Sequence, residues 1–217
     1  MVDLGMFCID STEVTNAQYV EFLAANVPPQ STTGEPAYCS FNTSYLPDAW
    51  PRPPAEASRP VMWVNWCSAA AFCEWSGKRL CGRIGGTPGD FNDYAVAGLS
   101  EWHWACTQGG MTTYPYGDTG DPTVCNIDVM NLNDVWDVGS GADCVGATAP
   151  FDEVFDLSAN AHEWTAECTG YVDELDDCRM RGGSYEHTLS DGACDDSSGL
   201  TRGNTWSDGT FRCCADN

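Results

Sequence analysis

Hydrophobic residues recur at helical spacing in a few parts of the chain, and the clearest of these lies near the amino end. Thr15 and Gln18 have the spacing of a capping box, in which the threonine oxygen caps the first turn and the glutamine reaches back. Tyr19, Phe22 and Leu23 then share one face of the helix that this cap would begin. The pattern predicts an amphipathic helix that starts at Thr15.

Two further helices are predicted where a capping residue precedes an apolar run. Asn65 can cap a helix from Cys67 to Trp75, whose alanine-rich centre favours a helix and which Gly77 would end. A third helix is predicted from Ser100 to Cys106, before the glycine pair at 109–110. Short apolar or β-branched runs predict four strands, which are Met6–Ile9, Val61–Val64, Met180–Gly183 and Gly209–Cys213.

Glycine and proline occur along the whole chain instead of gathering in a linker. The 22 glycines and 12 prolines make 34 of 217 residues, which favours short elements joined by many loops. A chain of 23.5 kDa is large enough to bury a sizeable core. We therefore expect one mixed α+β domain that covers residues 1–217.

The charge of the chain excludes some classes of partner. Nine lysines and arginines oppose 32 aspartates and glutamates, so the formal net charge is −23. A phosphate backbone or an anionic membrane would repel such a surface, and nucleic acid is therefore not expected as a partner. No run of apolar residues approaches the length of a membrane span.

Thirteen cysteines must be explained by disulfides or by metal binding. Zinc fits poorly, because the chain has no Cys-x-x-Cys pair and its three histidines are far apart in sequence. Disulfides indicate an oxidising compartment, so we expect a protein that is secreted or located at the cell surface or in the periplasm. Because the number is odd, at least one cysteine must be free, modified or bonded to another chain.

Eight groups of residues, taken in order, resemble the formylglycine-generating enzyme family, also called the sulfatase-modifying-factor family. Each group alone is weak evidence, but together they follow the order of the family and cover nearly the whole chain. They are Phe7–Asp10 with Glu13–Tyr19, Pro60–Trp75, Gly77–Leu80, Ser100–Trp102, Tyr114–Gly117, Asn160–Trp164, Arg181–Tyr185 and Phe211–Cys213. The resemblance implies a loop-rich, disulfide-stapled α+β fold, a variant of the C-type lectin fold.

The resemblance also implies two of the disulfides. Family disulfides match Cys73 with Cys213 and Cys106 with Cys194. Cys214 is expected to be the odd cysteine, facing outward and able to bond to a second chain. Proximity along the chain and tolerable loop lengths predict four more pairs. These are Cys8–Cys39, Cys67–Cys81, Cys125–Cys144 and Cys168–Cys178.

In the family, two cysteines shortly after a Gly-Gly-Ser-aromatic motif hold copper, and the enzyme uses O₂ to oxidise a substrate cysteine. A thiolate pair suits Cu(I). In this chain, counting forward from the motif places His187 and Gly192 at the two copper positions. Counting back from the cysteine of the Phe-Arg-Cys motif instead places Ser184 and Leu189 there. Neither register supplies a thiol, so copper is not expected.

The three histidines are not expected to form a site. His187 lies in a predicted loop beside Glu186, where a histidine is more often only a solvated side chain. His103 is expected to show one edge of its helix to solvent. An iron site made of His103, His162 and His187 has no support from their spacing.

Calcium is expected in the stretch from Asp156 to Glu163, where two carboxylates flank small residues whose carbonyls can turn inward. Ca²⁺ takes such a mixture of oxygen ligands. The matching family positions form a calcium site from the side chains of Asp156 and Glu163 and the carbonyls of Ala159 and Ala161.

A second calcium site of the family matches the side chain of Asn126 and the carbonyl of Ile127. Its acidic ligand is either Asp137 or Asp143, and the sequence leaves both open. Structural calcium is therefore expected at two places in the chain.

Together these features predict an exported, calcium-binding, disulfide-rich member of the family that lacks oxidase activity and acts as a binding or structural module. The alternative is a copper-dependent formylglycine-generating oxidase, or another metalloenzyme acting on a cysteine or sulfur substrate. The expected partner is another protein, a glycan or a second copy of the chain, joined through Cys214. The Gly82–Leu99 insertion and the Tyr185–Trp206 loop are expected to form the contact surfaces.

Overall fold

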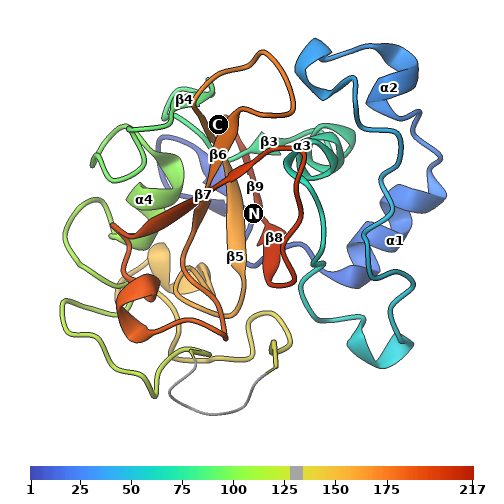
Figure 1. Cartoon of the computed structure of the whole chain (residues 1–217). Coiled ribbons are helices and arrows are strands. Elements are labelled where there is room, and N and C mark those ends of the chain that lie inside the picture. Colours follow the sequence, from blue (N-terminus) through green and yellow to red (C-terminus); the bar gives the residue numbers. More distant parts are fainter. Residues whose placement is uncertain (128–133) are drawn as a thin grey trace.

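The computed structural model describes residues 1–127 and 134–217, and it shows short strands between helices and long loops (Figure 1). In this view α1 (Asn16–Ala24), α2 (Gln30–Thr33) and α3 (Trp66–Trp75) lie on one side of the strands, and α4 (Glu101–Cys106) lies on the other. Single 3₁₀ turns occur in the loops; they are η1 (Ala37–Cys39), η2 (Pro54–Glu56), η4 (Phe151–Glu153) and η5 (Leu189–Gly192). No helix in the described part of the chain is long and apolar enough to cross a membrane.

The three helices predicted from the sequence form where their caps are. The side-chain oxygen of Thr15 accepts a hydrogen bond from the Gln18 amide at 3.2 Å, and Gln18 Oε1 accepts one from the Thr15 amide at 2.8 Å. Asn65 and Ser100 cap α3 and α4 in a similar way, accepting from the backbone amides three residues on at 2.8 and 3.2 Å. Each cap satisfies an amide that the first turn leaves unpaired.

An antiparallel sheet joins the two ends of the chain. Its four strands, in order, are β1 (Val2–Asp3), β2 (Cys8–Ile9), β9 (Cys213–Ala215) and β3 (Arg79–Leu80). The carboxy-terminal strand therefore lies between a strand from the amino end and one that follows α3. Any site near this sheet combines residues from both ends of the sequence.

The second sheet is built around β5 (His162–Cys168). One edge of β5 pairs with β6 (Asp177–Arg181), which in turn pairs with β7 (Ser197–Thr201), both antiparallel. On the other edge, β8 (Gly209–Phe211) and β4 (Gly89–Asp90) pair in parallel with the two ends of β5. All seven residues of β5 are buried, so this strand lies at the centre of the molecule.

The strand predictions are confirmed only in part. Three of the predicted strands overlap β2, β6 and β8, but Val61–Val64 is a buried loop and not a strand. Trp63 within it has a φ of +63°, which an extended strand does not allow. β5 was missed because a strand covered on both faces has no alternation of polar and apolar residues.

An aromatic core joins the two sheets to α1 and α3. Tyr19 of α1 stacks on Phe72 of α3 with ring centroids 5.7 Å apart, and Phe72 meets Phe211 of β8 edge to face at 5.4 Å. Trp164 of β5 is fully buried in the same cluster and donates its indole hydrogen to the Val64 carbonyl at 3.0 Å. These contacts hold β5 and β8 in a fixed position.

Six disulfides link the described residues. Four of them confirm predicted pairs, namely Cys73–Cys213, Cys106–Cys194, Cys125–Cys144 and Cys168–Cys178. The predicted Cys8–Cys39 and Cys67–Cys81 pairs are wrong, because the fold joins Cys39 to Cys67 and Cys81 to Cys214. Proximity in sequence did not indicate proximity in space for these four cysteines.

Cys214 is not the odd cysteine. Cys213 and Cys214 are neighbours on β9 and point to opposite sides of the strand, where they bond to Cys73 in α3 and to Cys81 just after β3; both bonds lie within the chain. Cys8 is the one cysteine in the described residues outside a disulfide, and it is partly buried on β2. Its thiol donates to Asn217 Oδ1 at 3.0 Å, next to the carboxy-terminal end of the chain.

The Gly82–Leu99 insertion folds back onto the second sheet. It contributes β4, and the rings of Phe91 and Tyr94 lie over the Arg179 guanidinium at 3.6 and 4.0 Å. The Tyr94 carbonyl also accepts a hydrogen bond from Arg181. Much of this insertion therefore covers β5 and β6.

Candidate functional site

The segments that flank β5, β6 and β8 meet at one end of the second sheet. His162 begins β5, and its amide donates to the Asp208 carbonyl at 2.8 Å, so the parallel pairing of β5 with β8 places Asp208 beside His162. Gly182-Gly183, both with positive φ, turn the chain after β6. The loop that follows returns to the segment before β5, where the Tyr185 amide donates to the Asn160 carbonyl at 3.1 Å.

This turn brings two histidines and one carboxylate together. Asp208 Oδ2 lies 3.6 Å from His162 Nδ1 and 3.5 Å from His187 Nδ1. The two imidazole centroids are 4.5 Å apart, and the Trp206 ring lies 5.7 Å from that of His162. Ser184 Oγ is 2.6 Å from His187 Nδ1. We call His162, His187 and Asp208 the histidine cluster.

The members of the histidine cluster differ in exposure. His162 and Asp208 are buried, whereas about a third of the His187 side chain, 36%, is exposed. His162 Nδ1 is buried without a hydrogen-bond partner among the described residues. Burial acts to raise the pKa of Asp208, but the nearby side chains of His162, Ser184 and His187 hold it below the ordinary value. Asp208 is therefore ionised at neutral pH.

The histidine predictions need correction in two respects. His187 was expected to be a solvated loop side chain, yet it is in contact with His162 and Asp208. His103 was expected to show an edge to solvent but is buried, and burial followed by the Arg181 charge lowers its pKa to about 4. Asp208 was not singled out, and its only signal was a position just before a predicted strand.

Glu163, one of the predicted calcium ligands, is held by other partners. Its two carboxylate oxygens accept hydrogen bonds from Arg212 Nε and Nη2 at 2.7 and 2.6 Å. Trp102 Nε1 donates to the same carboxylate at 2.9 Å. Glu163 thus connects β5 to α4 and to the residue that follows β8, and its charge is balanced by Arg212.

Asp156, the other predicted acidic ligand, lies in a cluster that the sequence did not reveal. Its Oδ2 accepts a hydrogen bond from the Gly139 amide at 2.6 Å. The neighbouring Glu13 is fully buried; its Oε1 accepts from Asn160 Nδ2 at 2.8 Å, but its Oε2 has no partner among the described residues. Burial, and then repulsion by Asp156, raises the pKa of Glu13 well above its usual range.

The charges of this cluster fit a divalent cation. The carboxylates of Glu13, Asp156 and Glu163 all attract the guanidinium of Arg212, which lies near each of them. Three carboxylates against one guanidinium leave two negative charges, which either bound protons or a cation must balance. Ca²⁺ takes carboxylate and carbonyl oxygens, and Glu13 Oε2 is a buried oxygen that still lacks a partner. The only sequence signal for Glu13 was its place in a family motif.

The other predicted calcium ligands lie close to this cluster. Ala159 and Ala161 are fully buried, and Ala159 has a φ of +68° within the turn before β5. The Asn126 carbonyl accepts a hydrogen bond from the Asn160 amide at 3.0 Å, and Ile127 is buried beside it. The two predicted calcium regions are therefore neighbours. Asp137 and Asp143 are both exposed.

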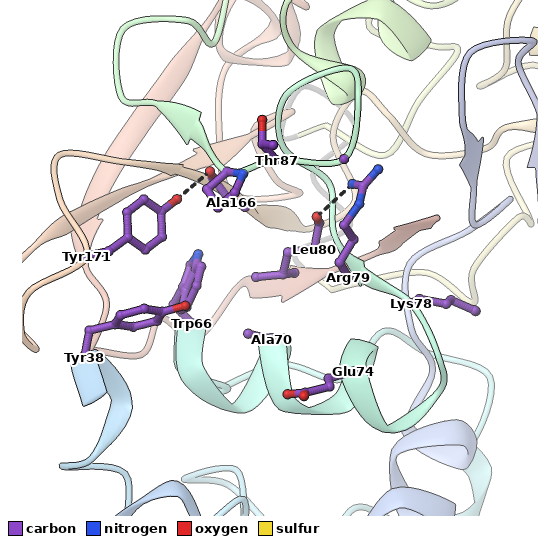
Figure 2. Close-up of a pocket in the computed structure, with 12 residues that line it drawn as sticks. Tyr38, Trp66, Ala70, Glu74, Lys78, Arg79, Leu80, Thr87, Ala166 and Tyr171 are labelled. Carbon is purple, nitrogen blue, oxygen red and sulfur yellow. Dashed lines mark hydrogen bonds between the residues drawn. The ribbon is translucent and has the colours of Figure 1, made fainter. Parts of the chain in front are cut away.

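A hollow of about 230 Å³ lies apart from the histidine cluster (Figure 2). Figure 2 shows Tyr38, Trp66 and Tyr171 on one side, where the Tyr171 hydroxyl donates to a β5 carbonyl at 2.7 Å. Lys78 and Arg79 line the other side, but their charges are paired with carboxylates at 2.7 and 2.6 Å. The hollow thus offers an aromatic wall, two paired basic groups and the carboxylate of Glu74, which has no ion pair among the described residues.

The fold and the disulfides define a class of protein: a loop-rich α+β domain stapled by disulfides, of the formylglycine-generating-enzyme type. The chain matches the Sulfatase-modifying factor enzyme 1-like domain over residues 1–217, and it belongs to this family. The resemblance found in the sequence is thereby confirmed.

Relatives within the family include active and inactive proteins. Bovine formylglycine-generating enzyme is 27% identical over 122 residues, which are 50% of this chain and 27% of that protein. The bovine protein named inactive C-alpha-formylglycine-generating enzyme 2 is 30% identical over 142 residues, which are 62% of this chain and 41% of that protein. The chain thus matches less than half the length of either relative.

Solved structures with the same fold cover almost the whole chain. CarF has a TM-score of 0.61 at 21% identity and covers 97% of this chain and 86% of its own. PvdO from Pseudomonas aeruginosa has a TM-score of 0.59 at 16% identity and covers 97% of this chain and 80% of its own. At these identities the likeness concerns the fold alone, and it confirms the predicted fold class.

Proposed function

We propose that this protein is a binding or structural module of its family that does not convert cysteine to formylglycine. The observation that carries the proposal is the state of the thiols. The loop after Gly182-Gly183 contains no cysteine before Cys194, and Cys194, Cys213 and Cys214 are all in disulfides. A disulfide does not ligate Cu(I) as a thiolate pair does. The remaining thiol, Cys8, lies on β2 in the other sheet.

Two further findings support this proposal. A relative at 30% identity bears the name of an inactive formylglycine-generating enzyme. Six disulfides in 217 residues favour an exported protein, since reducing compartments would not preserve them. The partners that fit such a module are another protein, a glycan or a second copy of the chain. With Cys214 bonded inside the fold, a covalent dimer would have to use Cys8.

We also propose that Ca²⁺ stabilises the module at the turn before β5. Asp156 and the carbonyls of Ala159 and Ala161 would supply ligands, and Glu13 adds the carboxylate oxygen that now lacks a partner. Glu163 would contribute its negative charge, although its carboxylate is already paired with Arg212. Asn126 and Ile127 remain the proposed ligands of a second Ca²⁺ nearby.

A direct assay tests the loss of oxidase activity. The purified chain is incubated with copper, O₂ and a cysteine peptide of the sulfatase type, and the aldehyde is measured by mass spectrometry. We expect no conversion under conditions in which a formylglycine-generating enzyme converts the peptide. Copper-dependent formation of the aldehyde would refute the proposal.

The histidine cluster favours the second candidate, a metalloenzyme with a different site. It would be supported if a transition metal allowed the chain to consume O₂ with a thiol substrate and if His187→Ala abolished this reaction. Equal consumption by the variant would assign the reaction to free metal or to another part of the chain.

A further inference from the structure

We propose that His162, His187 and Asp208 bind a divalent transition-metal ion of the Zn²⁺ type and leave one coordination position open to solvent. This site goes beyond the proposed function, because a binding module can carry it whether or not the family's oxidase chemistry is lost. It also differs from the proposed calcium sites in its residues and in its donor atoms.

Two of the distances within the histidine cluster are close to those expected around a shared ion. Two ligand atoms that each lie 2.0–2.1 Å from a tetrahedral Zn²⁺ are about 3.3 Å apart. Asp208 Oδ2 is 3.5 Å from one imidazole nitrogen and 3.6 Å from the other, and one atom from each of the three residues lies within 4.8 Å of the others. Direct N–H···O hydrogen bonds would be shorter, mostly 2.7–3.2 Å. An ion at the centre would therefore need only small movements of these side chains.

The burial of His162 supplies an independent argument. Its ring is buried next to Trp206, and its Nδ1 has no hydrogen-bond partner among the described residues. Buried polar atoms in folded proteins are nearly always satisfied, so an orphan atom turned toward two other ligand groups requires an explanation. A metal ion bound to His162 Nδ1 would provide the missing partner.

The donor set selects the kind of metal. Two imidazole nitrogens and one carboxylate oxygen suit Zn²⁺, Fe²⁺ and similar first-row ions, whereas Ca²⁺ prefers oxygen ligands and Cu(I) prefers sulfur. Three protein ligands are also the number in sites where zinc keeps water or a substrate as its fourth ligand. His187 is the exposed member, so the open position would face solvent beside the loop that carries Trp206.

The backbone holds the cluster in place. His162 and Asp208 are joined by a backbone hydrogen bond of 2.8 Å where β5 pairs with β8, and His187 is attached to the turn after β6 through its amide and the Ser184 carbonyl at 3.0 Å. Ser184 Oγ now contacts His187 Nδ1 at 2.6 Å, and a bound metal would replace this contact. Asp208 would be the one anionic ligand of the metal, although Asp191 lies near enough to act on both imidazoles and Asp196 near enough to act on that of His162.

Metal titration of the full chain tests the site. The protein is treated with chelator, transferred to buffer with excess Ca²⁺ to fill sites of oxygen ligands, and titrated with Zn²⁺ by calorimetry and with Co²⁺ by visible absorption. We expect one Zn²⁺ per chain and a Co²⁺ spectrum typical of nitrogen and oxygen ligands. His187→Ala and Asp208→Asn should each weaken binding by more than the roughly 10–100-fold that loss of an outer-shell partner costs.

Glu186→Gln is the matched control, because it removes an exposed carboxylate beside His187 without removing a proposed ligand. It should bind Zn²⁺ as the unchanged chain does. His187→Ala is the decisive variant, since its side chain is partly exposed and near-ultraviolet circular dichroism can establish that the variant folds. The proposal is overturned if the unchanged chain takes up no Zn²⁺, or if folded His187→Ala binds Zn²⁺ with the same affinity and stoichiometry.

Discussion

At the scale of single residues, Glu13 shows how a buried carboxyl depends on its neighbours. One carboxylate oxygen is bound by Asn160, and the other has no partner among the described residues. Burial, followed by repulsion from Asp156, raises the pKa of Glu13 well above its ordinary value. Without a cation, this group contributes stability that is fully present below the pKa of the unfolded state and is lost as the pH rises through the raised pKa.

Glu13→Gln should therefore stabilise the chelated protein at neutral pH. We expect its melting temperature in chelator at about pH 7.5 to rise by about 2 °C or more, which corresponds to about 1 kcal/mol for a chain of this size. The decline of the melting temperature as the pH rises above the ordinary pKa of glutamate should become shallower, because the glutamine carries no charge. The stabilisation by added Ca²⁺ should shrink as well.

Scanning calorimetry with and without Ca²⁺ provides the measurement, and Glu153→Gln, at an exposed position, is the control. A variant at position 13 that melts earlier in chelator and keeps its full response to Ca²⁺ would exclude Glu13 from a cation site.

At the scale of elements, β9 binds the termini and the helical side of the molecule together. It pairs with β2 and β3, and its two cysteines bond to Cys73 at the end of α3 and to Cys81 just after β3. The Cys81–Cys214 bond connects residues 133 positions apart. With Cys73–Cys213 also present, this bond closes a short ring of residues 73–81 and 213–214, and it restricts the unfolded chain as a small loop does.

Cys214→Ser should therefore destabilise the protein by about 2–5 kcal/mol, whereas Cys8→Ser should leave the melting temperature nearly unchanged. Thiol titration in denaturant should count one free thiol in the unchanged chain, none in Cys8→Ser and two in Cys214→Ser. A count of one thiol that remains in Cys8→Ser would show that another cysteine is free.

The helices and the strands differ in how far the sequence predicts them. Each helix cap is a side chain that accepts a hydrogen bond from the backbone amide three residues on, as Thr15, Asn65 and Ser100 do. The whole cap therefore lies within a short stretch of sequence. β5 is defined by the strands that pair with its two edges, and these come from residues 89–90, 177–181 and 209–211. Its seven buried residues, three of them charged or titratable, follow no pattern that a local reading would detect.

The same reasoning applies to the histidine cluster. The family motifs include the turn at Gly182-Gly183 and the start of β5, but the sequence did not lead us to expect that the histidines there meet. His162 and Asp208 meet only because β5 pairs in parallel with β8, a register that depends on the whole sheet. Similarly, Glu13 and Asp156 are 143 positions apart in sequence, and their repulsion arises from tertiary packing.

At the scale of the whole molecule, the excess of carboxylates remains mainly on the surface, because the described residues bury only six carboxylates and three arginines. Arg181, Arg202 and Arg212 are buried, although the chain has only nine basic residues in all. Arg202 lies among the rings of Tyr38 and Trp66, with its guanidinium 4.6 and 4.9 Å from their centroids. The remaining exterior carries a large excess of carboxylates, which repel one another.

Salt should therefore stabilise this protein. Raising NaCl from about 20 mM to about 300 mM shortens the range of charge repulsion to less than about 8 Å, and we expect the melting temperature at neutral pH to rise by several degrees with Ca²⁺ held in excess. An uncharged osmolyte at equal osmolality serves as the control. A melting temperature that falls with NaCl would mean that attractive ion pairs outweigh the repulsion.

The two disulfides of β9 also close a small covalent ring, which consists of the nine residues from Cys73 to Cys81 and the two at 213–214. Lys78 and Arg79 lie within this ring, and Arg212 directly precedes its carboxy-terminal part. A protease such as trypsin that cut after Lys78 would break the peptide chain without releasing a fragment, because each new end would remain bonded to the carboxy-terminal peptide. On a non-reducing gel the nicked protein would migrate as one species, and only reduction would separate its two halves.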